Sequence, residues 1–108
     1  MPIVVVAVLS AKPGRGAAVI ESFREVSPLV HDEDGCDLYA AHLEQNGDTV
    51  VMVERWSSRE ALDAHAAGRP LARLNELNAD LLERPYDVWL LDAVELGDPA
   101  KGLLPVAS

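Results

Sequence analysis

Two stretches of the chain, residues 3–11 and 86–96, are apolar at odd and even positions alike. Successive side chains of a strand point to opposite faces of a sheet, so strands of this composition need cover on both sides. The two stretches therefore constrain the fold more than any other feature of the sequence. They must lie in a sheet that packs on helices on one side and on further apolar surface on the other.

A helix and a hairpin are expected between these strands. Residues 17–31 carry an apolar stripe at helical spacing, although Pro28 is expected to kink or loosen the last turns because it lacks a backbone donor. Residues 36–44 and 49–56 alternate as strands. Asn46-Gly47-Asp48 between them is typical of a hairpin turn.

A second helical region follows the hairpin. Ser57 and Glu60 have the spacing of a capping box, which predicts a helix from Ser58 to about Gly68-Arg69-Pro70. A further helix with a leucine stripe then runs to Arg84-Pro85.

The order β-α-β-β-α-β predicts an α+β protein of ferredoxin-like fold with an antiparallel sheet. We expect one domain over residues 1–96 and a C-terminal tail over 97–108. Right-handed crossovers place all helices on the same face, which leaves the other apolar face bare. A second copy packed sheet against sheet is its simplest cover, so we expect a homodimer.

Composition excludes several classes of function. The net charge is −9 without a basic cluster, which argues against nucleic acid and anionic membrane surfaces as partners. No stretch reaches transmembrane length and the N-terminus lacks the features of a signal peptide. Cys36 is the only cysteine, so an internal disulfide is impossible. We expect a cytoplasmic protein.

Three side chains near the end of the hairpin are the candidate catalytic residues. Glu54 and Trp56 share one face of the predicted strand, and His65 falls on the apolar side of the helix that follows. His65 fits a general base, or else a helix histidine bonded to a backbone carbonyl. Trp56 fits a wall for an aromatic ring, or else a core indole. Glu54 would assist His65, or else bond a neighbouring group structurally.

Tyr39, His42 and Asn75 are the candidate substrate-binding residues. Tyr39 and His42 are expected on opposite faces of their strand, and Asn75 near the leucine stripe of its helix. The three histidines are too scattered for a metal motif, and no glycine-rich phosphate loop is present. We therefore expect neither a metal nor an organic cofactor.

Several motifs, in order, resemble the antibiotic biosynthesis monooxygenase family, which includes quinol monooxygenases. They are Lys12-Pro13-Gly14 after the first strand, Gly35-Cys36 with Tyr39, and the run from Glu54-Arg55-Trp56-Ser57-Ser58 through Glu60-Ala61-Leu62 to His65. The resemblance covers about residues 2–96. It implies a dimeric α+β barrel.

The resemblance also implies a cofactor-independent monooxygenase that oxidises a small phenol or quinol with O₂. Haem-degrading relatives carry an asparagine in the first strand, where this chain has Val6-Ala7-Val8, which argues against haem cleavage. Two alternatives stay open: a dimeric module that binds a small molecule without catalysis, and an isomerase of a small ketone on the same fold.

Overall fold

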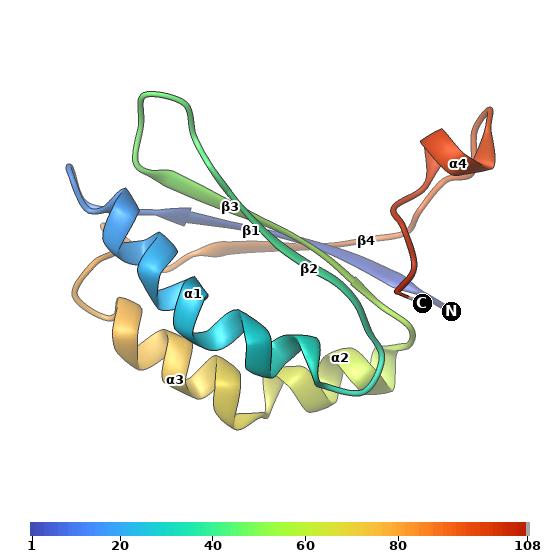
Figure 1. Ribbon diagram of the computed structural model, residues 1–108, viewed down its shortest axis with the longest axis horizontal. Helices are drawn as coiled ribbons and strands as arrows, with labels where there is room; N and C mark the ends of the chain where they lie inside the picture. The colour runs from blue at the N-terminus through green and yellow to red at the C-terminus, as the bar shows by residue number, and fades with distance from the viewer. Residues whose placement is uncertain (108) are drawn as a thin grey trace.

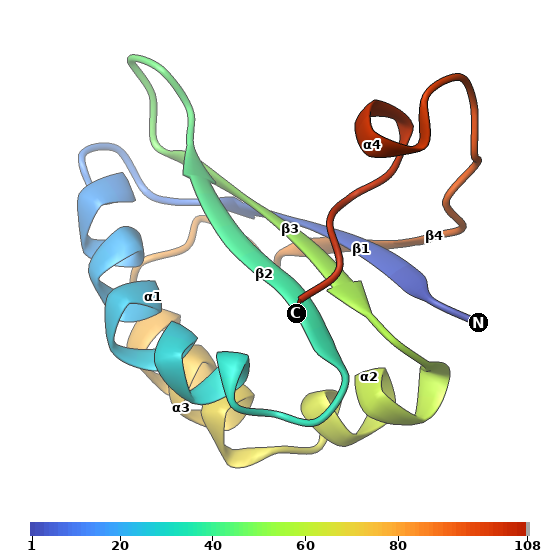
Figure 2. The same ribbon diagram turned by 45° about the vertical axis from the view of Figure 1, so that its right-hand side comes forward.

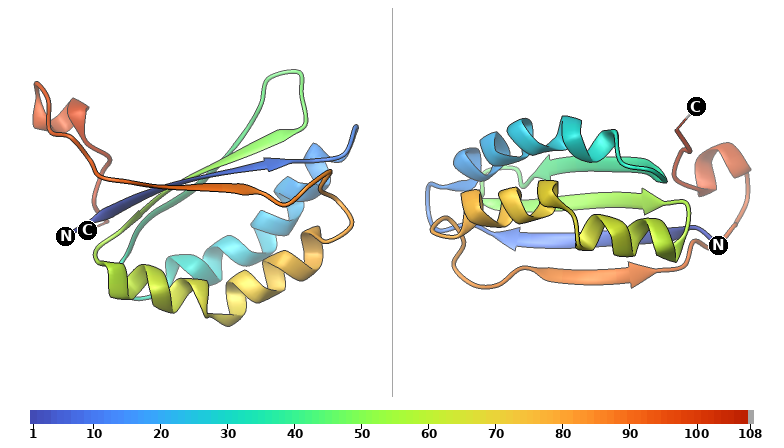
Figure 3. Two further views of the ribbon diagram at one scale, coloured as in Figure 1. Left: turned by 180° about the vertical axis from the view of Figure 1, so that it is seen from behind. Right: turned by 90° about the horizontal axis from the view of Figure 1, so that it is seen from below.

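The computed structural model describes residues 1–107 of the protein. Its strands are β1 (Ile3–Ser10), β2 (Cys36–Leu43), β3 (Thr49–Trp56) and β4 (Asp87–Leu91), and its helices are α1 (Gly16–His31), α2 (Arg59–Ala66), α3 (Arg69–Asn78) and the short α4 (Pro99–Gly102). The strands form one antiparallel sheet in the order β2-β3-β1-β4. Helices α1, α2 and α3 cover one face of that sheet (Figures 1 and 3). The predicted ferredoxin-like α+β fold is confirmed.

Strand β1 lies in the middle of the sheet and has apolar side chains on both faces. Val5, Ala7 and Leu9 are buried under the helices. On the other face Val6 stands between Val53 of β3 and Trp89 of β4. The expectation of a strand that is apolar on both sides is therefore confirmed for β1.

Strand β4 is shorter than expected, because it ends at Leu91 instead of at residue 96. Leu91 pairs with Val4 of β1. Continued pairing would soon reach Pro2, which has no backbone N–H to give to a ladder. The extent of β4 is thus set by the strand beside it.

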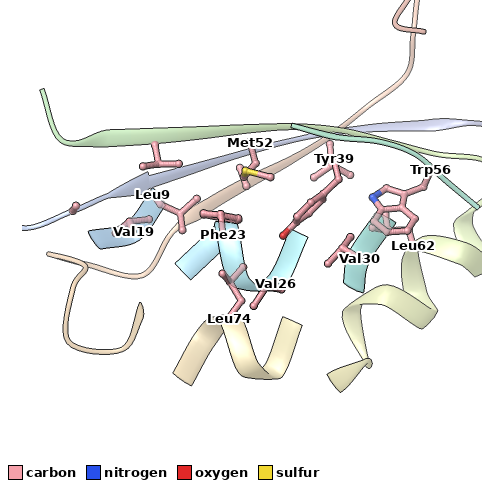
Figure 4. Packing of buried hydrophobic residues seen from close by; sticks show 14 residues of the cluster. Leu9, Val19, Phe23, Val26, Val30, Tyr39, Met52, Trp56, Leu62 and Leu74 are labelled. Carbon is pink, nitrogen blue, oxygen red and sulfur yellow. The ribbon is translucent and has the colours of Figure 1, made fainter. Parts of the chain in front are cut away.

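The core fills the space between the sheet and the helices (Figure 4). Helix α1 supplies Val19, Phe23, Val26 and Val30, the predicted stripe, and all four are buried. Pro28 does not end α1, which continues to His31. Pro28 is on the exposed side of the helix, where water can solvate the carbonyl that loses its partner.

Two helix boundaries differ from the predictions. The cap of α2 is Ser58, whose hydroxyl accepts from the Ala61 N–H at 3.1 Å, and not Ser57. Helix α3 ends at Asn78 instead of near Arg84. Beyond it the backbone bonds to the end of β1, with the Lys12 N–H donating to Leu81 O at 2.8 Å. That tertiary pairing competes with continuation of the helix.

Strand β2 contains an irregularity at Asp37 that changes the side on which Cys36 lies. Cys36 pairs with Trp56 and Leu38 pairs with Arg55, although Trp56 and Arg55 are adjacent. Cys36 consequently lies on the face of Trp56 and packs against the core cluster, whereas strict alternation along β2 would place it on the same face as Leu38.

The C-terminal segment folds back on the side of the sheet away from the helices (Figures 1 and 2). Arg55 reaches it with Nη1, which donates to Leu104 O at 3.3 Å, while Nε donates to Asp37 Oδ2 at 3.3 Å. Ser108, the last residue of the predicted tail, lies outside the described residues. Within residues 1–107, no helix combines the length and apolar character needed to cross a membrane.

Candidate active site

A cavity of about 280 Å³ lies between the helical face of the sheet and helices α2 and α3. Its floor consists of apolar strand side chains: Val5, Ala7, Leu9, Met52, Val88 and Leu90. Phe23, Leu62, Leu71 and Leu74 form the opposite wall. Strand alternation from three strands aims these side chains at one space, and mostly apolar walls are typical of small-molecule sites.

His65 brings an imidazole to this cavity from α2. The residue is 5% exposed, and its Nδ1 lies 2.7 Å from Glu33 Oε1. No partner of Nε2 is found among residues 1–107, and no fully buried side-chain nitrogen or oxygen in that range lacks one. Nε2 therefore reaches open space, and His65 lines the cavity. Its predicted place on the apolar side of the helix is confirmed.

Trp56 holds the imidazole instead of lining the cavity. The two rings stack with centroids 4.5 Å apart and planes 28° apart. Tyr39 meets the imidazole edge-on at 5.7 Å. Trp56 is fully buried. Of the two alternatives left open by the sequence, the burial of Trp56 favours the core indole over a wall for an aromatic ring, and His65 covers one of its faces.

Glu54 is 6% exposed and lines the cavity. Its Oε1 accepts the indole N–H of Trp56 at 3.0 Å, which is the structural bond considered from the sequence. Burial raises the pKa of Glu54, and the negative charge of Glu33 adds to this, while the Trp56 bond and His65 act in the opposite direction. Burial thus disfavours the ionised form of Glu54, the form that would repel an anion, relative to an exposed glutamate.

Tyr39 also lines the cavity, from β2. Burial, followed by the negative charge of Glu54, raises the pKa of Tyr39 far above its ordinary value. Its hydroxyl remains a neutral hydrogen-bond donor over the whole range in which proteins usually work.

The other two candidate binding residues are separated by the sheet. His42 is exposed on the face away from the helices, with Nδ1 3.2 Å from Val51 O, and so lies outside the cavity. Asn75 lines the cavity from α3, where its Oδ1 accepts from the Tyr86 hydroxyl at 3.4 Å.

Three residues of the site were not predicted from the sequence. Phe23 was expected only as core, and Tyr86 only as the start of a strand. Nothing in the sequence links Glu33 to His65, because the two are 32 residues apart and meet only in the folded chain. No group of three or more potential metal ligands gathers within residues 1–107.

Comparison with known proteins agrees with this architecture. The family model described as antibiotic biosynthesis monooxygenase matches residues 2–76. The chain belongs to the antibiotic biosynthesis monooxygenase family. The family resemblance drawn from the motifs is thereby confirmed.

Individual relatives match most of the domain. The protein named probable quinol monooxygenase YgiN, from Escherichia coli strain K12, is 30% identical over 91 residues, which cover 73% of this chain and 88% of YgiN. The structure of Rv0793 from Mycobacterium tuberculosis superimposes with a TM-score of 0.80 at 26% identity, covering 91% of this chain and 100% of that one. A crystal structure described as antibiotic biosynthesis monooxygenase gives a TM-score of 0.77 at 30% identity, covering 86% and 99%.

Proposed function

We propose that the protein is a monooxygenase that oxidises a small phenol or quinol with O₂, using His65 as the general base. The observation that carries the proposal is that His65, whose Nε2 has no partner among residues 1–107, lines an apolar cavity. Membership of a monooxygenase family and a relative named as a quinol monooxygenase support the same reaction class.

The size of the cavity limits the substrate. A cavity of about 150 Å³ holds one benzene ring. At about 280 Å³, this cavity suits a system of one or two rings better than a larger polycycle. Phe23, Tyr39 and Tyr86 supply aromatic surface for such a ring in place of Trp56.

The reaction begins with transfer of the phenolic proton to His65 Nε2. The resulting phenolate is a far better one-electron donor to O₂ than the phenol, and apolar walls limit its quenching by water. Recombination of the two radicals forms a peroxide. The imidazolium returns its proton to the peroxide, which becomes a hydroperoxide. Loss of the hydrogen on the same ring carbon then breaks the O–O bond, so that one oxygen atom stays on the ring as a carbonyl and the other leaves as water with these two hydrogens. The substrate supplies the electrons.

Two neighbouring side chains support this chemistry. Burial of Glu54 disfavours the charged carboxylate, which would repel the phenolate. The Tyr39 hydroxyl remains protonated and is available as a donor to a substrate oxygen.

Oxygen uptake with 1,4-naphthohydroquinone tests the proposal, after subtraction of its spontaneous oxidation. Wild type should consume O₂ without any added cofactor, and His65→Ala should lose about 10²- to 10⁴-fold of that rate. His42→Ala is the matched control and should keep it, since His42 lies outside the cavity. Tight ligand binding without O₂ uptake would refute the proposal in favour of a binding module. Ketone isomerisation without O₂ uptake would instead favour an isomerase.

We also propose that two copies pack through their open sheet faces. Ala40, Val53, Val6 and Trp89 stand side by side across that face, and Trp89 is 54% exposed. A stable interface needs about 800 Å² from each partner.

Sedimentation equilibrium tests the dimer. The expected mass is twice the 11.6 kDa of one chain, and Trp89→Glu should weaken the association. Leu29→Glu, at an equally exposed leucine on α1, should leave it unchanged. A single species of 11.6 kDa at tens of micromolar protein would contradict the dimer.

A further inference from the structure

Glu33 lies on the turn between α1 and β2, and its carboxylate bonds the nitrogen of His65 that does not serve as the proposed base. The Nδ1 to Oε1 distance is 2.7 Å. An ionised carboxylate has acceptors only, so the hydrogen of this bond belongs to Nδ1. In the neutral imidazole, Nε2 is then left with a free lone pair, which is the form a general base requires.

The turn that carries Glu33 is held tightly against the start of α2. The Ser57 N–H donates to Gly35 O at 2.8 Å. Gly35 has a φ of +78°, and a Cβ there would lie 2.5 Å from Ala61 Cβ and 2.6 Å from Ser57 Oγ. Only glycine fits this approach, which fixes the position of the turn relative to the helix that carries His65.

The other end of α2 approaches the same carboxylate. A Cβ on Gly68 would lie 3.1 Å from Glu33 Oε2 and 3.3 Å from the carbonyl oxygens of Ala64 and His65. The absence of a side chain at Gly68 leaves room for the carboxylate beside the imidazole.

His65 separates two spaces. It lines the apolar cavity, and it also lines a hollow on the outer surface together with Glu33, Asp34 and Glu60. Glu33 lines only the outer hollow, and its side chain is 20% exposed. A substrate in the cavity therefore contacts the imidazole and not Glu33, so any influence of Glu33 on the reaction must act through His65.

We propose that Glu33 is the positioning residue for His65: it holds the ring as the Nδ1–H tautomer with Nε2 toward the cavity, and its charge stabilises the imidazolium that forms when the ring takes up a proton. The stacked indole of Trp56 supports the same orientation by restricting rotation of the ring. The effect on catalysis rests on the proposed function, whereas the tautomer does not.

The tautomer is measured on the ligand-free protein. Long-range ¹H–¹⁵N spectra at about pH 8 distinguish the two forms of a neutral imidazole, and His65→Ala assigns the signals. Wild type should show the Nδ1–H form. Glu33→Gln should retain it, because the amide oxygen accepts the same bond, and Glu33→Ala should give a mixture of tautomers. Asp34→Asn, which removes a charge from an exposed position of the same turn, is the matched control and should resemble wild type. An unchanged tautomer in Glu33→Ala would overturn the positioning role.

The role of the charge is measured by O₂ uptake with 1,4-naphthohydroquinone. Glu33→Gln should lower kcat about ten- to a hundredfold at nearly unchanged KM, because the amide keeps the bond that orients the ring but removes the charge that stabilises the imidazolium. Asp34→Asn should keep the wild-type kcat. A kcat of wild-type size in Glu33→Gln would overturn the charge contribution, and this variant does not depend on whether Glu33→Ala folds. If wild type itself consumes no O₂, the proposed function fails, while the spectra still decide the positioning role.

Discussion

Replacement of Glu54 by leucine tests how much the bond between this buried carboxyl and Trp56 contributes to the stability of the fold. Glu54 Oε1 is the acceptor of the Trp56 indole N–H at 3.0 Å, and both residues are almost entirely buried. Glu54→Leu leaves that donor without a partner in the core. A buried unsatisfied donor costs about 1–3 kcal/mol. For a domain of this size the loss corresponds to a decrease in Tm of roughly 4–12 °C.

The free energy of unfolding should also depend on pH through Glu54, because its carboxyl can ionise. This dependence distinguishes the effect of the charge from the effect of the bond to Trp56. Burial raises the pKa of Glu54 in the folded state, so this group contributes most to stability below the ordinary glutamate pKa. That contribution is lost as the pH rises through the raised value. Glu54→Gln keeps an acceptor for Trp56 and cannot ionise. It should match wild type near pH 4 and be more stable than wild type at pH 8.

The assay is urea denaturation followed by far-UV circular dichroism at both pH values and at one fixed protomer concentration. A double-mutant cycle with Trp56→Phe isolates the bond, because phenylalanine has no N–H to satisfy. We expect a coupling free energy of about 1–2 kcal/mol. The role of the bond is refuted if Glu54→Leu costs as much in the Trp56→Phe background as in wild type. The role of the charge is refuted if the difference in stability between Glu54→Gln and wild type is the same at pH 4 and pH 8.

Two further predictions follow from perturbed groups outside the cavity. Burial, followed by the negative charge of Glu33, raises the pKa of the Cys36 thiol to about 11, so iodoacetamide should alkylate the folded protein at pH 8 far more slowly than the urea-unfolded chain. Equal rates would contradict this. Asp48 accepts from the Gly14 N–H at 2.9 Å and the Gly16 N–H at 3.0 Å, and these bonds lower its pKa. Its contribution to stability is present above the ordinary aspartate pKa and is lost as the pH falls through the lowered value, so Asp48→Asn should flatten the decrease in Tm between about pH 4 and pH 2. A variant with the wild-type acid profile would count against the role of these bonds.

The local sequence pattern correctly predicted those features that depend on a single helix, strand or turn. The Asn46-Gly47 hairpin was predicted from turn chemistry, and Asn46 indeed has a positive φ of 59°. The bounds of β3 and the buried stripe of α1 also agree, since side-chain period alone sets the faces of a strand or helix.

The predicted ends of β4 and α3 were wrong, because in each case a second segment of the chain determines where the element ends. The end of β4 depends on the length of β1, and the end of α3 depends on backbone bonds between Leu81 and Lys12. A local sequence pattern does not predict such pairings, because the competing partner lies far away along the chain.

The candidate site shows the same division. The sequence by itself determined that Glu54 and Trp56 share a strand face and that His65 lies on the apolar side of the next helix. Only the tertiary structure decided that Trp56 stacks on His65 instead of on a ligand, that His42 lies beyond the sheet, and that Glu33 bonds the imidazole. Periodicity fixes the side on which a residue lies, whereas its partner on that side is chosen by how distant segments pack.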